Sequence, residues 1–299
     1  MTVVFDALAM VLMAYVLGFL FYGFYRQLSA RVHRRWGPPI IQNFIDNVKL
    51  LAKKEAVSHG AMFYFGPLIM AAGSVTTLLF VPFLYGSDWL QGFSADGNLI
   101  LVMYLMLMGP LGNALAVGAG GNPFGVMGVT RGLTRLIGIE TPFFLGLALV
   151  MLQYGTTSIH GIMEAQAQSG TWTLLSNPLA FAILFLPLVG SMGSSPFDVV
   201  AAPVEVYSGP RAEFGGKFLG LLLTQNMIFS IAKLVLMVDL FLGGAGSIPE
   251  LIAKGFGLFV AIIIVGMVFG RFKTEQAVDF YFKFPLALGA VAVAVTLWI

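Results

Sequence analysis

The chain has 299 residues, of which 58% are hydrophobic and only 10% are charged, and its formal net charge is +2. Soluble domains usually carry about 25% charged residues, so this composition excludes an ordinary soluble protein and indicates many membrane spans. The chain contains no cysteine, which excludes a disulfide, a thiolate nucleophile and a cysteine-bound iron–sulfur or nickel centre. Any such centre has to belong to a partner.

Eight apolar runs are long enough to predict transmembrane helices, since a helix needs about 20 mostly apolar residues to cross the hydrocarbon. They cover roughly residues 3–25, 62–85, 98–118, 124–152, 178–194, 217–243, 255–270 and 281–299. Strands of alternating polarity are absent from the sequence, which favours helices over a barrel. We therefore predict an all-α polytopic membrane protein with about eight transmembrane helices, forming a single integral membrane domain over residues 1–299.

The basic residues predict the orientation of the chain in the cell membrane. Seven of the 16 lysines and arginines fall between the first two runs: Arg26, Arg31, Arg34, Arg35, Lys49, Lys53 and Lys54. Because basic connections stay in the cytoplasm, residues 26–61 are predicted to be a cytoplasmic basic loop. Alternate connections repeat this bias, so both termini are predicted to lie outside. Nothing basic precedes the first run, which predicts a retained span rather than a cleaved signal peptide.

The basic loop contains a predicted amphipathic helix between Ile40 and Lys54. Its apolar residues recur at helical spacing and face away from the polar ones. Such a helix is expected to lie on the cytoplasmic face of the membrane, and its polar side could bind either anionic lipid or a soluble subunit. The preceding Gly37-Pro38-Pro39 restricts the backbone, which favours rigid presentation to a protein partner.

In the fourth run, Arg131 and Arg135 share a helix face, and Glu140 lies about a turn and a half further along. A carboxylate inside a membrane is costly, so Glu140 is expected either to be protonated or to face a hydrated cavity with a basic partner. A structural ion pair or a helix-end acid, before Thr141-Pro142, is the alternative.

Residues 195–216 form a predicted cytoplasmic acidic loop between the fifth and sixth runs. It contains the sequence Pro196-Phe197-Asp198, then Glu205, Arg211 and Glu213. An acidic cluster at a membrane mouth favours an ion or proton route, whereas a solvated loop is the alternative. If this segment is helical, Asp198 and Glu205 share a face to within about 20°.

The sixth run carries two charged residues, Lys233 and Asp239, within an apolar stretch. They are six residues apart and therefore lie on different faces of one helix, which predicts different neighbours for each. Lys233 near mid-span is expected to change protonation readily. Asp239 lies close enough to the outer end to be hydrated there.

The sequence shows no self-contained catalyst. The three histidines lie far apart and outside the apolar runs, so they have no metal-ligand spacing. The serine-rich stretch at residues 190–195 has no histidine partner in any span, and phosphate-binding and dinucleotide motifs are absent from the sequence.

Three segments together resemble membrane subunit 1 of respiratory complex I and its relatives. The segment Arg34-Arg35-Trp36-Gly37-Pro38, followed by Gln42, Asp46, Lys49 and Lys54-Glu55, resembles that family's first cytoplasmic loop. The stretch from Pro196 to Gly216 is similar to its acidic quinone-facing loop. The segment Gly270-Arg271-Phe272-Lys273, followed by Lys283-Phe284-Pro285, resembles its ending. Arg131 to Glu140 fits an arginine-bearing span of the family with a buried glutamate.

The departures from the quinone-using members indicate a branch of the family. The first loop is short, and Ala201 and Pro203 stand where further acids are expected. This resembles the membrane-anchor subunits of energy-converting membrane-bound hydrogenases and related ferredoxin-linked reductases, whose acceptor is not a quinone.

The resemblance implies a non-catalytic subunit of a redox-driven ion pump. It would anchor cytoplasmic hydrogenase-like and iron–sulfur subunits, which hold iron–sulfur clusters and, in the hydrogenases, a nickel–iron site, beside antiporter-like membrane subunits. The expected ion pathway contains Glu140, Glu205, Glu213, Asp198, Lys233 and Asp239. The expected docking residues are Arg34, Arg35, Gly37, Pro38, Asp46, Lys49, Arg271 and Lys273. A quinone-reducing relative, an autonomous secondary transporter and a purely structural anchor are the alternatives, and the choice between protons and sodium stays open.

Overall fold

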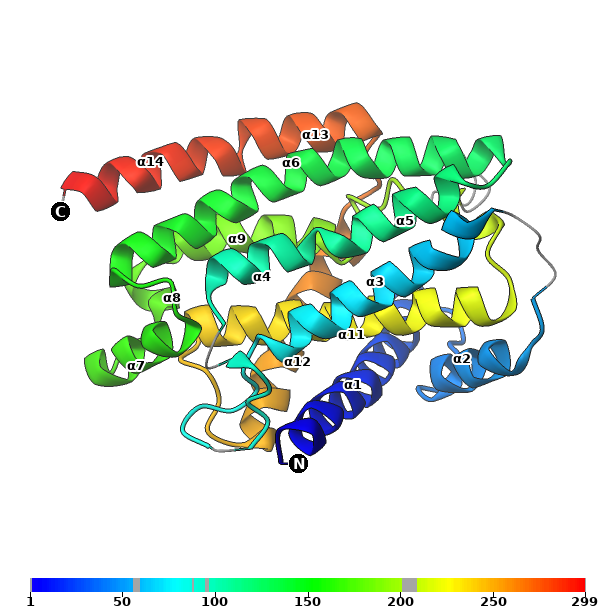
Figure 1. Ribbon diagram of the computed structural model, residues 1–299. Coiled ribbons are helices and arrows are strands. Elements are labelled where there is room, and N and C mark those ends of the chain that lie inside the picture. The colour runs from blue at the N-terminus through cyan, green and yellow to red at the C-terminus, as the bar shows by residue number, and fades with distance from the viewer. Residues whose placement is uncertain (1, 56–59, 88, 95–96, 201–208, 299) are drawn as a thin grey trace.

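The structure is a computed structural model that describes residues 2–55, 60–87, 89–94, 97–200 and 209–298 (Figure 1). Within these ranges the regular elements are all helices. They are α1 (Thr2–Val32), α2 (Gln42–Ala52), α3 (Ala61–Leu79), α4 (Leu99–Met106), α5 (Met108–Gly118), α6 (Pro123–Tyr154), α7 (Ile159–Ser169), α8 (Thr173–Ser176), α9 (Pro178–Ser191), the 3₁₀ turn η2 (Gly209–Ala212), α11 (Gly216–Phe241), α12 (Ile248–Val268), α13 (Thr274–Lys283) and α14 (Pro285–Trp298).

The all-α membrane fold is confirmed: seven helical segments of the described chain are long and apolar enough to cross a membrane. The segments Leu99–Gly118 and Thr274–Val295 each combine two helices with a short break. Between α4 and α5 the break precedes Pro110, which has no N–H to donate to the carbonyl of Met106. The predicted span 178–194 corresponds to α9, which is shorter, with 14 residues.

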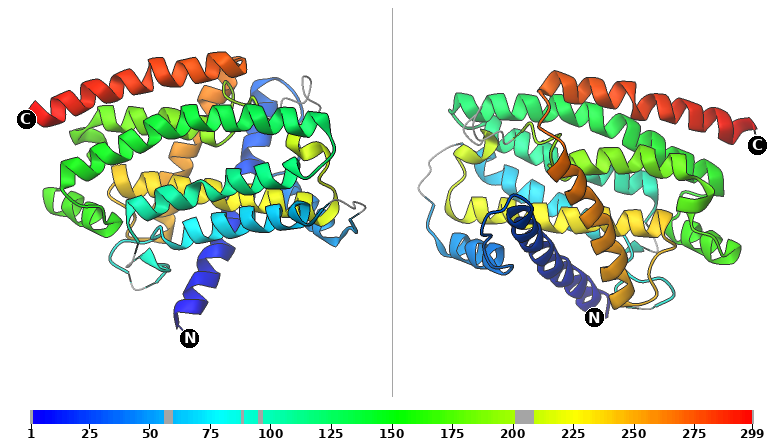
Figure 2. Two further views of the ribbon diagram at one scale, coloured as in Figure 1. Left: turned by 45° about the horizontal axis from the view of Figure 1, so that its top comes forward. Right: turned by 180° about the vertical axis from the view of Figure 1, so that it is seen from behind.

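Helix α11 lies at the centre of the molecule. Its most apolar stretch is 78% buried, compared with 22% to 44% for the other candidate spans. Figures 1 and 2 show α3 and α5 on one side of α11 and α1 and α12 crossing it on the other. An apolar helix enclosed on all sides can carry a charged group only where neighbours supply polar partners or water, because hydrocarbon supplies neither.

The predicted amphipathic helix is present as α2, beside α1 and the first part of α11 (Figure 1). Its inner side is anchored by a polar residue, Asn47, which is fully buried. The Asn47 Nδ2 donates to the hydroxyl of Tyr15 at 3.0 Å and to the Oγ1 of Thr224 at 2.8 Å. The apolar residues of α2, including Phe44 and Val48, stay partly exposed. One amide therefore joins α2 to both α1 and α11.

At the opposite end of α1, Asp6 binds the connection between α3 and α4. Its carboxylate accepts from the backbone N–H groups of Leu90 at 2.5 Å, Gln91 at 2.9 Å and Gly92 at 2.9 Å. Charged acceptors make strong hydrogen bonds with backbone N–H groups, so Asp6 fixes the start of the chain to this connection.

We predict that Asn47→Leu weakens the docking of α2. The substitution removes two hydrogen bonds and leaves the Thr224 and Tyr15 hydroxyls without this partner, which should cost about 2 kcal/mol. Faster hydrogen exchange in α2 and a lower thermal unfolding temperature of the solubilised protein would report the loss. Val48→Ala, at an exposed position of the same helix, is the control. Equal exchange in both variants would contradict the prediction.

Candidate functional site

A cavity of about 650 Å³ opens between α1, α5, α6, α11 and the segment that follows α9. Its charged lining residues are Arg26, Asp46, Arg135, Glu140, Asp198, Arg211 and Lys233. Three of the predicted ion-pathway residues, Glu140, Asp198 and Lys233, therefore share one space. A membrane protein tolerates such a polar group of residues where it faces a hydrated cavity instead of lipid.

The cavity exists because α9 ends inside the protein. Its 14 residues rise about 21 Å, less than the hydrocarbon thickness. After Ser191 the chain turns through Gly193, which has a φ of +69°, a conformation that favours glycine. The prediction that this span continues to residue 194 is thus wrong by three residues, and the early end leaves the last carbonyls of α9 in need of donors.

Three helices supply those donors. Arg135 on α6 donates through Nη1 to the carbonyls of Gly190 at 3.1 Å and Phe197 at 3.0 Å. Lys233 on α11 makes a long contact of 3.5 Å from Nζ to the Ser191 carbonyl. The helix dipole places partial negative charge at this end, so the two cations are stabilised there.

The third donor is Tyr22 on α1, a cavity residue that sequence reasoning missed. Its hydroxyl donates to the Met192 carbonyl at 3.3 Å and lies 3.3 Å from the Oγ of Ser230. Ser230 and Lys233 are one turn apart on α11, and both line the cavity. The sequence signal was a polar face on apolar α1, formed by Tyr22, Tyr25 and Arg26.

Glu140 lies on α6 within the cavity. Its Oε2 is buried and has no hydrogen-bond partner among the described residues. The cations Lys233 and Arg135 line the same cavity. Two environments were expected for Glu140 from the sequence, and this geometry corresponds to the second, a polar cavity with basic neighbours.

Asp198 lies in a non-helical segment, held in place by its neighbour Phe197. The Phe197 ring is buried against Phe280 and Tyr281 of α13, with ring centroids at 5.3 and 4.6 Å. Asp198 forms an ion pair with Arg271 at 3.4 Å. The suggested helical alignment of Asp198 with Glu205 is wrong at Asp198, and Glu205 itself lies outside the described residues.

The remaining predicted pathway acids lie away from this cavity. Glu213 packs its carboxylate against Gly120, where an added Cβ would collide with it, and its Oε2 is buried without a hydrogen bond among the described residues. Asp239 lies near the other end of α11 and is 1% exposed. It is therefore buried instead of hydrated as expected.

Four predicted docking residues are exposed basic side chains: Arg34, Arg35, Lys49 and Lys273. Asp46 instead pairs with Arg26 at 3.7 Å and accepts from Gln42 at 2.7 Å. Arg271 is engaged with Asp198. Gly37 and Pro38 are half-buried in the connection that leads to α2. Among the described residues, no cluster of three or more acids and histidines could hold a metal ion.

Comparisons with known proteins cover nearly the whole chain. The profile of the family described as NADH dehydrogenase matches residues 5–297. The chain is 28% identical over 313 residues to the H subunit of NADH-quinone oxidoreductase from a Geobacillus species, a match that covers 96% of this chain and 91% of the relative. It is 26% identical over 295 residues to the H subunit of F(420)H(2) dehydrogenase from Methanosarcina acetivorans, covering 88% and 84%.

A solved structure is similar over the same extent. It is a chain of the membrane-bound sulfane sulfur reductase, an archaeal respiratory membrane complex. The two chains superpose with a TM-score of 0.91 at 33% identity, and the match covers 99% of this chain and 100% of the other. The similarity therefore extends over the whole arrangement of helices.

We predict that Arg135→Gln loosens the segment after α9. Gly190 and Phe197 lose a charged donor inside the protein, which should cost about 3 kcal/mol and expose residues 192–200 to exchange. Hydrogen exchange measured over this segment tests the expectation. Arg135→Lys keeps the charge but not the planar group that bridges both carbonyls, so it should fall between the parent and Arg135→Gln. Unchanged exchange in Arg135→Gln would refute the bridging role.

Proposed function

The chain belongs to the NADH dehydrogenase family, and on that premise we propose that it is the membrane subunit of a complex I-like, redox-driven ion pump. This proposal rests on the cavity at the end of α9, which Glu140, Lys233 and Asp198 line. It brings an acid without a hydrogen-bond partner and a buried amine into one space that is large enough for water. Such a pair can exchange a proton through water.

The same geometry suggests how a reaction outside the membrane could reach Glu140. The segment after α9 carries Asp198, and Arg135 ties this segment to α6, on which Glu140 lies. A displacement of the segment would change the charges that face Glu140 and so its protonation. Coupling of this kind needs an element with two arrangements. Our candidate is the stretch from Ser194 to Gly216, of which residues 201–208 lie outside the described ranges.

The exposed basic residues support an anchoring role. Arg34, Arg35, Lys49 and Lys273 come from the two predicted cytoplasmic connections beside α2 and α13. We propose that they bind the cytoplasmic arm, whose iron–sulfur subunits carry the electrons. Charged residues at such a surface set the orientation and association rate of a partner more than its affinity.

We also propose to which branch of the family the chain belongs. The short first loop, together with Ala201 and Pro203, favours a ferredoxin-linked complex over a quinone reductase. A hydrogenase-type complex is the first candidate. A sulfur-reducing complex is the second, and the similarity to the sulfane sulfur reductase chain favours it. Metal analysis and product assay of the natively purified complex separate them: nickel with hydrogen evolution supports the first, and sulfide formation without nickel supports the second.

We predict that Glu140→Gln leaves assembly and electron transfer intact but uncouples ion movement. Glutamine keeps the shape of the side chain and cannot carry the proton, so ions moved per electron should fall by about 100-fold. Electron-transfer rate and vesicle ion uptake are measured together in membranes that contain the whole complex. Glu164→Gln, at an exposed position on α7, is the matched control. Normal ion movement in Glu140→Gln would remove this residue from the pathway.

A further inference from the structure

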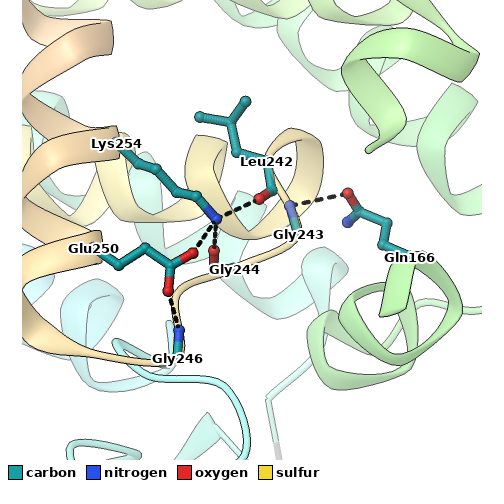
Figure 3. A network of polar contacts seen from close by, with 7 residues as sticks. All are labelled: Gln166, Leu242, Gly243, Gly244, Gly246, Glu250 and Lys254. Carbon is teal, nitrogen blue, oxygen red and sulfur yellow. Dashed lines mark hydrogen bonds and ion pairs between the residues drawn. The ribbon is translucent and has the colours of Figure 1, made fainter. Parts of the chain in front are cut away.

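A second polar network lies at the end of α11 away from the cavity (Figure 3). Its centre is the ammonium of Lys254 on α12, which donates to the carbonyls of Leu242 at 2.8 Å and Gly244 at 2.6 Å. It also pairs with Glu250 at 2.6 Å and lies 5.2 Å from the centre of the Trp172 ring. An ammonium has three donors, and these three oxygens occupy them.

Gln166 of α7 binds further backbone groups at this helix end. Its Nε2 donates to the carbonyls of Asp239 at 2.9 Å and Leu240 at 3.2 Å, and its Oε1 accepts from the N–H of Gly243 at 3.1 Å (Figure 3). Together Gln166 and Lys254 satisfy the backbone groups that a helix terminus leaves open. A purely structural cap accounts for all of these contacts.

The cap does not account for the Asp239 side chain. Asp239 is 1% exposed, and its Oδ2 is buried with no hydrogen-bond partner among the described residues. Burying a carboxylate in this way costs several kcal/mol unless it is protonated or paired. Of the neighbouring helices, α12 supplies the charged groups Lys254 and Glu250, whereas α7 supplies the uncharged Gln166 here. Lys254 binds the carbonyls of Leu242 and Gly244, three and five residues beyond Asp239, so its ammonium lies at the same end of α11.

The three ionisable side chains form a graded path to the surface. Glu250 has 43% of its side chain exposed and Lys254 has 16%, whereas Asp239 is 1% exposed. Toward the cavity, α11 continues through Leu234, Val235, Leu236, Met237 and Val238, all buried and apolar. A dry segment of this kind resists the free passage of ions between the cavity and Asp239.

We propose that Asp239, Lys254 and Glu250 form a proton-release station, through which this chain itself delivers protons to the side of the membrane opposite the cavity. The proposal rests on the proposed ion-pumping function and adds an exit within this subunit. Asp239 receives a proton from the cavity side and holds it as a neutral carboxyl. For release, the Lys254 ammonium moves from Glu250 to Asp239, the Asp239 proton passes to the Glu250 carboxylate that this movement frees, and Glu250 gives the proton to water.

The proton count balances in this step. Asp239 loses one proton, water beside Glu250 gains it, and Lys254 keeps its charge while it exchanges one carboxylate for the other. The next proton from the cavity side neutralises Asp239 and returns Lys254 to Glu250.

The test uses inside-out vesicles that contain the whole complex and are driven by reduced ferredoxin. Asp239→Asn keeps the side-chain shape but cannot release a proton. Electron transfer and proton uptake from the outer medium in a single turnover should persist, whereas acidification of the vesicle interior should fall by about 100-fold. Two pH-sensitive dyes, one on each side, report uptake and release separately. Asp279→Asn is the control, since Asp279 forms an exposed ion pair with Lys283 at 2.8 Å on α13.

A second variant covers the case in which Asp239→Asn does not assemble. Glu250→Gln keeps an acceptor for Lys254 at the exposed end, and it should slow interior acidification by about tenfold. Normal acidification in assembled Asp239→Asn overturns the proposal, and normal acidification in Glu250→Gln does so if Asp239→Asn is lost. Failure of the parent complex to acidify the vesicles despite electron transfer would instead overturn proton pumping itself.

Discussion

The early end of α9 within the span is the feature on which the described site depends. Carbonyl groups at a helix end need donors, and hydrocarbon provides none. Arg135, Lys233 and Tyr22 reach this end from α6, α11 and α1. Once two cations are brought into the interior to bind carbonyls, a nearby acid is stabilised by their charge, and Glu140 takes that position. The charged cavity is thus a consequence of one short helix.

The end of α11 at Phe241 meets the same requirement in a different way. There the helix stops near the surface, and its carbonyls are bound by Gln166 and Lys254. The end of α9 and this end of α11 therefore both combine helix carbonyls, a lysine and an acid. The difference lies in the space around them: Glu140 faces a cavity of about 650 Å³, whereas Asp239 is enclosed. Water can assist proton exchange at the first, and side-chain rearrangement has to do so at the second.

Much of the fold could be predicted from the sequence, because backbone groups in lipid must be bonded within their own helix. The largest differences occur where tertiary contacts offset a local cost. The seventh span was predicted to begin at residue 255, but α12 begins at Ile248, since Glu250 and Lys254 bind each other and the end of α11. Hydropathy counts these charges as unfavourable and has no term for their partners.

The site was predictable residue by residue but not as an arrangement. Glu140 and Lys233 stood out because charges within apolar runs are rare, and both line the cavity. Glu213 stood out because it belongs to the acidic loop between two apolar runs, yet its carboxylate packs against Gly120 instead. Which buried charges share one space depends on how distant helices pack, and a single sequence does not encode that in a local pattern. Tyr22 was missed because a tyrosine in a span is ordinarily a packing residue.

The spacing of the two lysine–acid groups along α11 has an electrical consequence. Lys233 and Asp239 are separated by a rise of about 9 Å, roughly a third of the hydrocarbon thickness. A membrane potential falls mainly across the least polar layer, so most of it would act across the apolar residues 234–238. Moving one proton against 100 mV costs about 2.3 kcal/mol. In the proposed proton route, that cost would be concentrated in the single step between the cavity and Asp239, so the energy of the proposed redox reaction would have to be applied at this step.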